Sequence, residues 1–174
     1  IETISKGTFQ TELGDYLSDQ FPLRDTMIKI NTLVNKISGA KNINGAYIGK
    51  NDLDMIFDSN LNGSKKFIRK DIVIPSSKVA AFDKEIIMKL DNLLVDVLFT
   101  PGHSRGSCCY RIGNELFSGD TLFEDGFGRV DLYGGSQDDL DKSLKYIFSL
   151  NNDTIVFPGH GDDTTIGEER KRYI

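Results

Sequence analysis

The sequence predicts an α/β domain, 46–174, preceded by a helical N-terminal segment, 1–45. The first observation is that apolar residues recur at helical spacing in 22–38 and again in 137–150. The second is that short runs typical of strands are separated by glycine, proline and asparagine. The predicted strands are 46–49, 86–90, 93–100, 107–112, 115–119 and 154–157. The polar stretch 39–45 is the predicted linker.

The N-terminal helix is predicted to begin at Pro22, because proline suits a first helical turn in which its missing N–H needs no partner. It is predicted to end before Gly39, since glycine favours helix termination. Its apolar face would contain Leu23, Met27, Ile30, Val34 and Ile37.

The helix in 137–150 has a predicted N-cap at Ser136, with Asp139 at the third helical position as in a capping box. Its buried stripe is predicted to contain Leu140, Leu144, Ile147 and Phe148. The tail, 164–174, is predicted to form a last helix whose run EERKR is a solvated face.

Composition narrows the classes of partner. The chain has 174 residues, of which 39% are hydrophobic and 27% charged, as in an ordinary globular domain. Its net charge is −5 and it contains no basic block, which argues against nucleic acid as a partner. No apolar run is long enough to predict a membrane span. The adjacent Cys108 and Cys109 lack the spacing of a zinc or redox motif, and they favour a reducing compartment.

The chain has only two histidines, His103 and His160, and each follows a Pro-Gly pair at the end of a predicted strand. Asp120 follows another predicted strand end. Loops at the edge of a rigid sheet hold side chains at fixed angles. Two imidazoles and one carboxylate form a borderline ligand set that suits zinc, iron or manganese. The alternative is that the histidines are surface turn residues and that Asp120 is a turn or cap aspartate.

These residues also carry a family resemblance. The stretch TPGHSRGSCCYRIGNELFSGDTLFEDGFGRVDLYGG at 100–135, with VFPGHGDDTTIGEE at 156–169, resembles the C-terminal half of a metallo-β-lactamase-fold hydrolase. The closest branch is the glyoxalase II-like one, of hydroxyacylglutathione hydrolases and their relatives. IFDSNLNGS at 56–64 resembles the mid-domain loop of that family, and the resemblance covers about 47–174.

The resemblance implies a partial αββα sandwich, its second half, with metals at the edge of the sheets. It implies that His103 ligates a first metal, that Asp120 bridges two metals and orients the attacking group, and that His160 ligates the second. A metal-bound hydroxide would attack the carbonyl of a small acyl or thioester substrate, with zinc as the expected metal and iron or manganese as alternatives. The expected location is the cytoplasm.

The family also uses an H-x-H-x-D-H segment, and these 174 residues contain no third histidine. Asp52, Asp54 and Asp58 precede the matched loops, but their spacing does not qualify them as substitutes. Each metal would keep two ligands, fewer than the three of ordinary catalytic zinc sites. We therefore expect weak metal binding and impaired hydrolysis. The alternative is a catalytically inactive metal-binding remnant or chimeric scaffold.

The segment 10–51 resembles a different family. YLSDQFPLRD at 16–25 and NGAYIGK at 44–50 are similar to the region after the membrane anchor of alginate O-acetyltransferase-like proteins, envelope proteins of SGNH type. A third hypothesis is therefore an envelope protein of that kind. Half of a sandwich also leaves one face of its sheet without a partner sheet. We expect that this face is buried in a homo-oligomer, is covered by helix 22–38, or stays uncovered.

Arg129 and Asp131 match a family segment beside the metals. They either position a substrate loop or form an ion pair that fixes the loop, and the ion pair is the favoured interpretation. The predicted strand 107–112 contains Tyr110 and both cysteines. Because neighbours on a strand point to opposite faces, we expect one thiol of Cys108 and Cys109 to be buried and the other half-exposed.

Overall fold

A computed structural model describes residues 46–67, 69–73, 79–90 and 93–173. The predicted helix 22–38 and the whole segment 1–45 lie outside the described residues, so the two-part division of the chain stays a prediction. Within the described ranges, no helix is long and apolar enough to cross a membrane.

A six-stranded sheet with the order β10-β9-β6-β5-β4-β3 organises the domain. Four strands form an antiparallel meander, and β9 pairs with β6 in parallel after a long crossover. The strands are β3 (Ile86–Leu90), β4 (Leu93–Phe99), β5 (Cys108–Ile112), β6 (Glu115–Gly119), β9 (Ile155–Pro158) and β10 (Thr164–Thr165). The predicted strands in this region are confirmed to within a residue or so.

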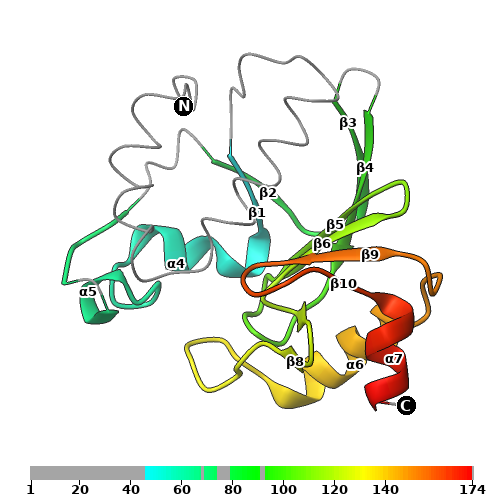
Figure 1. Cartoon of the computed structure of the whole chain (residues 1–174). Coiled ribbons are helices and arrows are strands. Elements are labelled where there is room, and N and C mark those ends of the chain that lie inside the picture. Colours follow the sequence, from blue (N-terminus) through cyan, green and yellow to red (C-terminus); the bar gives the residue numbers. More distant parts are fainter. Residues whose placement is uncertain (1–45, 68, 74–78, 91–92, 174) are drawn as a thin grey trace.

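Two helices cover one face of the sheet, at the lower right of Figure 1: α6 (Gln137–Ile147) and α7 (Ile166–Tyr173). The predicted cap is confirmed, because the Ser136 hydroxyl accepts a hydrogen bond from the Asp139 N–H at 3.3 Å. The helix ends at Ile147, earlier than predicted. The predicted stripe lies in the main core, which contains Leu98, Cys109, Leu116, Leu122, Leu140, Leu144, Ile147, Phe148, Val156 and Ile166.

The opposite face of the sheet carries a continuous apolar row. Val97, Tyr110, Phe117 and Phe157 occupy successive positions across four paired strands, and the last two rings stack with centroids 5.2 Å apart. Val97 and Phe117 are buried. At one end of this face lies a small parallel sheet of β1 (Ala46–Gly49) and β2 (Val79–Phe82), the strands at the upper left of the larger sheet in Figure 1.

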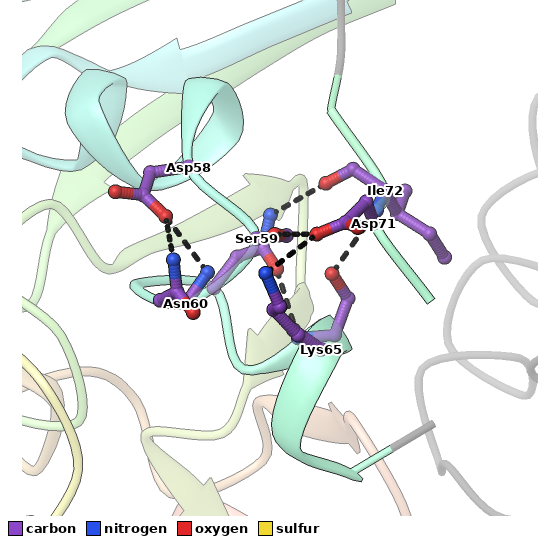
Figure 2. Close-up of polar contacts among 8 residues, drawn as sticks. Asp58, Ser59, Asn60, Lys65, Asp71 and Ile72 are labelled. Atoms are coloured by element: carbon purple, nitrogen blue, oxygen red, sulfur yellow. Dashed lines mark hydrogen bonds and ion pairs between the residues drawn. The ribbon is translucent and has the colours of Figure 1, made fainter. Parts of the chain in front are cut away.

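Short elements that were not predicted follow β1: the 3-10 helix η1 (Lys50–Asp52), α4 (Leu53–Phe57) and α5 (Ser64–Phe67). Figure 2 shows how polar contacts hold the loop between and after these helices. The Asp58 carboxylate accepts hydrogen bonds from the backbone and side-chain nitrogens of Asn60, at 2.8 and 2.9 Å. The Ser59 hydroxyl donates to Asp71 at 2.5 Å, and Lys65 forms an ion pair with Asp71. Side-chain bonds, rather than an apolar core, therefore order this segment.

Candidate metal centre

The loop that carries His103 connects β4 to β5 and packs tightly against α6. The Ser136 N–H donates to the Gly102 carbonyl at 2.8 Å, and the Ser143 hydroxyl donates to the Pro101 carbonyl at 2.7 Å. Gly102 has φ +148°, and a Cβ at this position would come within 2.5 Å of the Leu140 backbone. Only glycine fits here, which explains why the histidine follows a Pro-Gly pair in this strand end.

The orientation of the His103 ring is fixed by a backbone carbonyl. The Nδ1 atom lies 2.8 Å from the carbonyl oxygen of Arg129. Because a carbonyl oxygen can only accept, Nδ1 must carry the proton and donate it. The Nε2 atom then faces the Asp120 carboxylate, with Oδ2 at 3.5 Å. Nε2 of a neutral ring and a carboxylate oxygen are both acceptors, so this pair needs either a proton or a cation between its members.

The segment that supplies this carbonyl is fixed by an ion pair. The Arg129 guanidinium donates two hydrogen bonds to the two carboxylate oxygens of Asp131, both at 2.6 Å. This bidentate contact holds the pKa of Asp131 down at about 2. The predicted ion pair is confirmed, and its place in the structure is directly beside the hydrogen bond that orients His103.

Asp120 lies at the end of β6, next to the end of β9, because these two strands are parallel and their carboxyl ends meet. The Gly159 N–H donates to the Gly119 carbonyl at 2.7 Å, and a Cβ on Gly159 would fall on the Asp120 carboxylate. The second Pro-Gly pair therefore also allows a close approach. His160 follows immediately, and its ring packs on Phe123 with centroids 4.0 Å apart.

A buried hydrogen bond joins the two strand ends that present His103 and Asp120. The hydroxyl of Thr100 lies 3.1 Å from the hydroxyl of Thr121, and both side chains are almost fully buried. Sequence reasoning did not single out either threonine. Their position directly before Pro-Gly-His and directly after Asp120 was the available signal.

The pair of His103 and Asp120 fits a metal ion. Two ligands at about 2.1 Å from a tetrahedral ion are separated by about 3.4 Å, close to the observed 3.5 Å. Among the described residues, however, no group of three or more histidine, cysteine, aspartate or glutamate side chains is arranged to hold a metal. The convergence of His160 with the other two residues therefore stays a prediction.

The other potential ligands in this region serve different purposes. Burial raises the pKa of the Cys108 thiol to about 12 and that of Cys109 to about 11, so both thiols stay protonated at neutral pH. Cys109 is buried and Cys108 is half-buried, as predicted for neighbours on a strand. The Asp54 carboxylate accepts hydrogen bonds from Arg105 and from Tyr133, both at 2.8 Å. These contacts use one carboxylate oxygen of Asp54, as the contacts from Asn60 use one oxygen of Asp58.

The model of the protein family described as "Metallo-beta-lactamase superfamily" matches residues 39–160 of this chain. The "Probable metallo-hydrolase YqgX" of Bacillus subtilis is 34% identical over 128 residues, which cover 71% of this chain and 60% of that protein. The "Hydroxyacylglutathione hydrolase GloC" of Haemophilus influenzae is 39% identical over 89 residues, covering 49% of this chain and 42% of GloC. The chain thus spans about half the length of these curated relatives.

Solved structures show the same likeness. The BLEG-1 B3 metallo-β-lactamase superposes with a TM-score of 0.67 at 32% identity, covering 82% of this chain and 67% of BLEG-1. TTHA1623 in a di-iron-bound form gives a TM-score of 0.60 at 31% identity, with the same coverage. The resemblance of 10–51 to alginate O-acetyltransferase-like proteins receives no support from these findings, and most of that segment lies outside the described residues. The family match and the shared fold together show that this chain belongs to the metallo-β-lactamase superfamily.

Proposed function

We propose that the protein is a metal-dependent hydrolase of the glyoxalase II-like kind, acting on a thioester or related acyl substrate. The observation that carries the proposal is the pair of acceptors, His103 Nε2 and Asp120 Oδ2, held 3.5 Å apart at the edge of the sheet. The similarity to GloC, whose name states a hydroxyacylglutathione substrate, supports this substrate class.

In this proposal His103 and Asp120 would hold a first metal, and Asp120 and His160 a second. The bound metal would lower the pKa of water and polarise the substrate carbonyl. The protein's own part is to direct the ligands: the Arg129 carbonyl accepts a hydrogen bond from His103 Nδ1–H, which turns Nε2 toward the metal site. Zinc suits this set of nitrogen and oxygen ligands. Iron suits it as well, and the TTHA1623 structure is described as di-iron-bound.

A second candidate is a metal-binding protein without turnover. It is favoured by two observations: only two histidines occur in the 174 residues, and the described residues include no three-ligand group. The free thiols Cys108 and Cys109 fit a reducing compartment, and for either candidate we propose the cytoplasm.

Metal analysis of the purified chain separates the two candidates. After reconstitution with zinc, iron or manganese and desalting, the bound metal is measured by mass spectrometry, and hydrolysis of a hydroxyacyl-glutathione thioester is followed in the same samples. The hydrolase predicts bound metal and turnover, both lost in Asp120→Asn and both kept in Asp153→Asn, a matched change at an exposed position. Metal without turnover supports the second candidate, and the absence of both would refute the metal centre itself.

A further inference from the structure

Asp52 is a buried acidic residue whose carboxylate contacts the His103 loop at two points. It is 8% exposed and lies at the end of η1. Its Oδ2 accepts a hydrogen bond from the Ser104 hydroxyl at 2.5 Å, and its Oδ1 accepts one from the Gly106 N–H at 2.8 Å. Hydrogen bonds to an ionised carboxylate are shorter and stronger than neutral ones.

The fit between Asp52 and the loop leaves no spare room. A Cβ on Gly106 would lie 2.8 Å from the Asp52 carboxyl carbon, and a Cβ on Gly49 would collide with the Gly106 carbonyl. The loop therefore reaches the carboxylate only because two glycines allow the two backbones to touch. This close approach joins chain segments more than fifty residues apart.

The two contacts lie on the segment that determines the position of His103. Ser104 directly follows the histidine, and its hydroxyl is also 2.7 Å from the hydroxyl of Ser107, at the other end of the loop. A second carboxylate on the same short stretch, Asp54, ties Arg105 of this loop to Tyr133. Tyr133 belongs to the same segment as Arg129, whose carbonyl accepts the hydrogen bond from His103 Nδ1–H.

We propose that Asp52 is a positioning residue of the candidate metal centre: by holding Ser104 and Gly106 it fixes the backbone from which His103 reaches both the Arg129 carbonyl and the Asp120 carboxylate. The inference rests on the proposed function, since the purpose of the fixed ring is to present Nε2 to a metal. In this proposal Asp52 acts through the loop and not as a ligand, and both of its carboxylate oxygens accept hydrogen bonds from that loop.

The test uses two variants that weaken or remove one hydrogen bond from opposite sides. Asp52→Asn keeps the shape of the side chain and can still accept from Gly106, but it removes the negative charge, and the Ser104 hydroxyl must then accept from the amide N–H₂ instead of donating to a carboxylate. Ser104→Ala removes the hydroxyl and leaves the carboxylate. The control is Asp58→Asn, the same chemical change in a residue whose carboxylate caps Asn60.

Two quantities are measured in the whole 174-residue chain: the exchange of the His103 Nδ1–H with water, from nitrogen-15 correlation spectra of the metal-free protein, and the dissociation constant for zinc. We expect the unmodified chain and Asp58→Asn to show a slowly exchanging Nδ1–H on His103, held by the Arg129 carbonyl. In Asp52→Asn and Ser104→Ala this Nδ1–H should exchange rapidly with water, with zinc binding weakened about 10-fold to 100-fold, as for other residues that orient metal ligands.

The proposal is overturned if both variants fold yet keep the slowly exchanging Nδ1–H and the zinc affinity of Asp58→Asn. If Asp52→Asn does not fold, Ser104→Ala decides alone, because it leaves the carboxylate and its bond to Gly106 in place. A chain that binds no zinc at all would refute the proposed function. The exchange of the His103 Nδ1–H in the metal-free protein would still decide whether Asp52 positions His103.

Discussion

Substituting alanine for Gly102 tests whether the close approach of the His103 loop to α6 is a structural requirement. A Cβ on Gly102 would lie 2.5 Å from Cα and Cβ of Leu140 and 2.6 Å from its backbone nitrogen. Favourable carbon–carbon contacts are about 3.5–4.0 Å, so the loop and the helix would have to separate by about 1 Å. The hydrogen bond from Ser136 to the Gly102 carbonyl spans the same junction and would lengthen with it.

Two costs add in Gly102→Ala. Forcing extra volume into a packed junction costs about 1–3 kcal/mol. Holding a residue with a side chain at φ +148° costs about 1–3 kcal/mol more. We therefore expect the free energy of unfolding to fall by about 2–6 kcal/mol, a large fraction of the 5–15 kcal/mol typical of a domain.

Urea unfolding followed by far-ultraviolet circular dichroism measures this loss. The matched control is Gly113→Ala, at the tip of the β5–β6 hairpin, where φ is +59° and a Cβ would meet nothing within 4 Å. In the control the free energy of unfolding should fall by only about 1–2 kcal/mol, the cost of holding alanine in a left-handed backbone conformation. If Gly102→Ala is no less stable than Gly113→Ala, the junction with α6 is not as tight as described and the reasoning is wrong.

Three further predictions concern other parts of the domain. Gly159→Ala should push the Asp120 carboxylate aside and lower metal uptake, measured by mass spectrometry, while the fold persists. Ser136→Ala should cost about 1 kcal/mol in urea unfolding, because the Asp139 N–H loses its acceptor. Burial raises the pKa of Cys109 from 9.0 to about 11, so this thiol's contribution to stability is complete below pH 9. It should be lost between pH 9 and 11 by up to about 1.4 kcal/mol per pH unit. Unfolding free energies against pH for Cys109→Ala should therefore show a shallower alkaline decline, and an unchanged slope would contradict this.

The regular part of the fold could be predicted from the sequence because its signals are local. The apolar stripe of α6 and its cap at Ser136 depend on residues within a few positions of one another. Strands β5 and β6 flank a Gly-Asn turn, and this too is a short-range signal. The parallel pairing of β6 with β9 joins segments some forty residues apart, so neither hydrophobic periodicity nor turn residues predict it.

The candidate site was predicted through its side chains, whereas its supports lie in the backbone and in distant segments. The two Pro-Gly-His stretches drew attention to His103 and His160 because histidine is scarce in this chain. The acceptor for the His103 proton is a main-chain carbonyl, which no residue type marks. The spacing of Asp52 does not mark it as a ligand, and its contact with Ser104 joins segments 52 residues apart, which no local pattern indicates.

The main-chain acceptor beside His103 also affects how the protein tolerates mutation. Every residue has the same carbonyl, so no single amino-acid replacement at position 129 removes that atom. Such a replacement can change the path of the main chain, because it removes the guanidinium that donates two hydrogen bonds to Asp131. In random mutagenesis around the centre, we therefore expect metal binding to survive varied side chains wherever the path of the main chain is kept. Insertions and deletions between Gly128 and Gly134 should weaken it far more than substitutions.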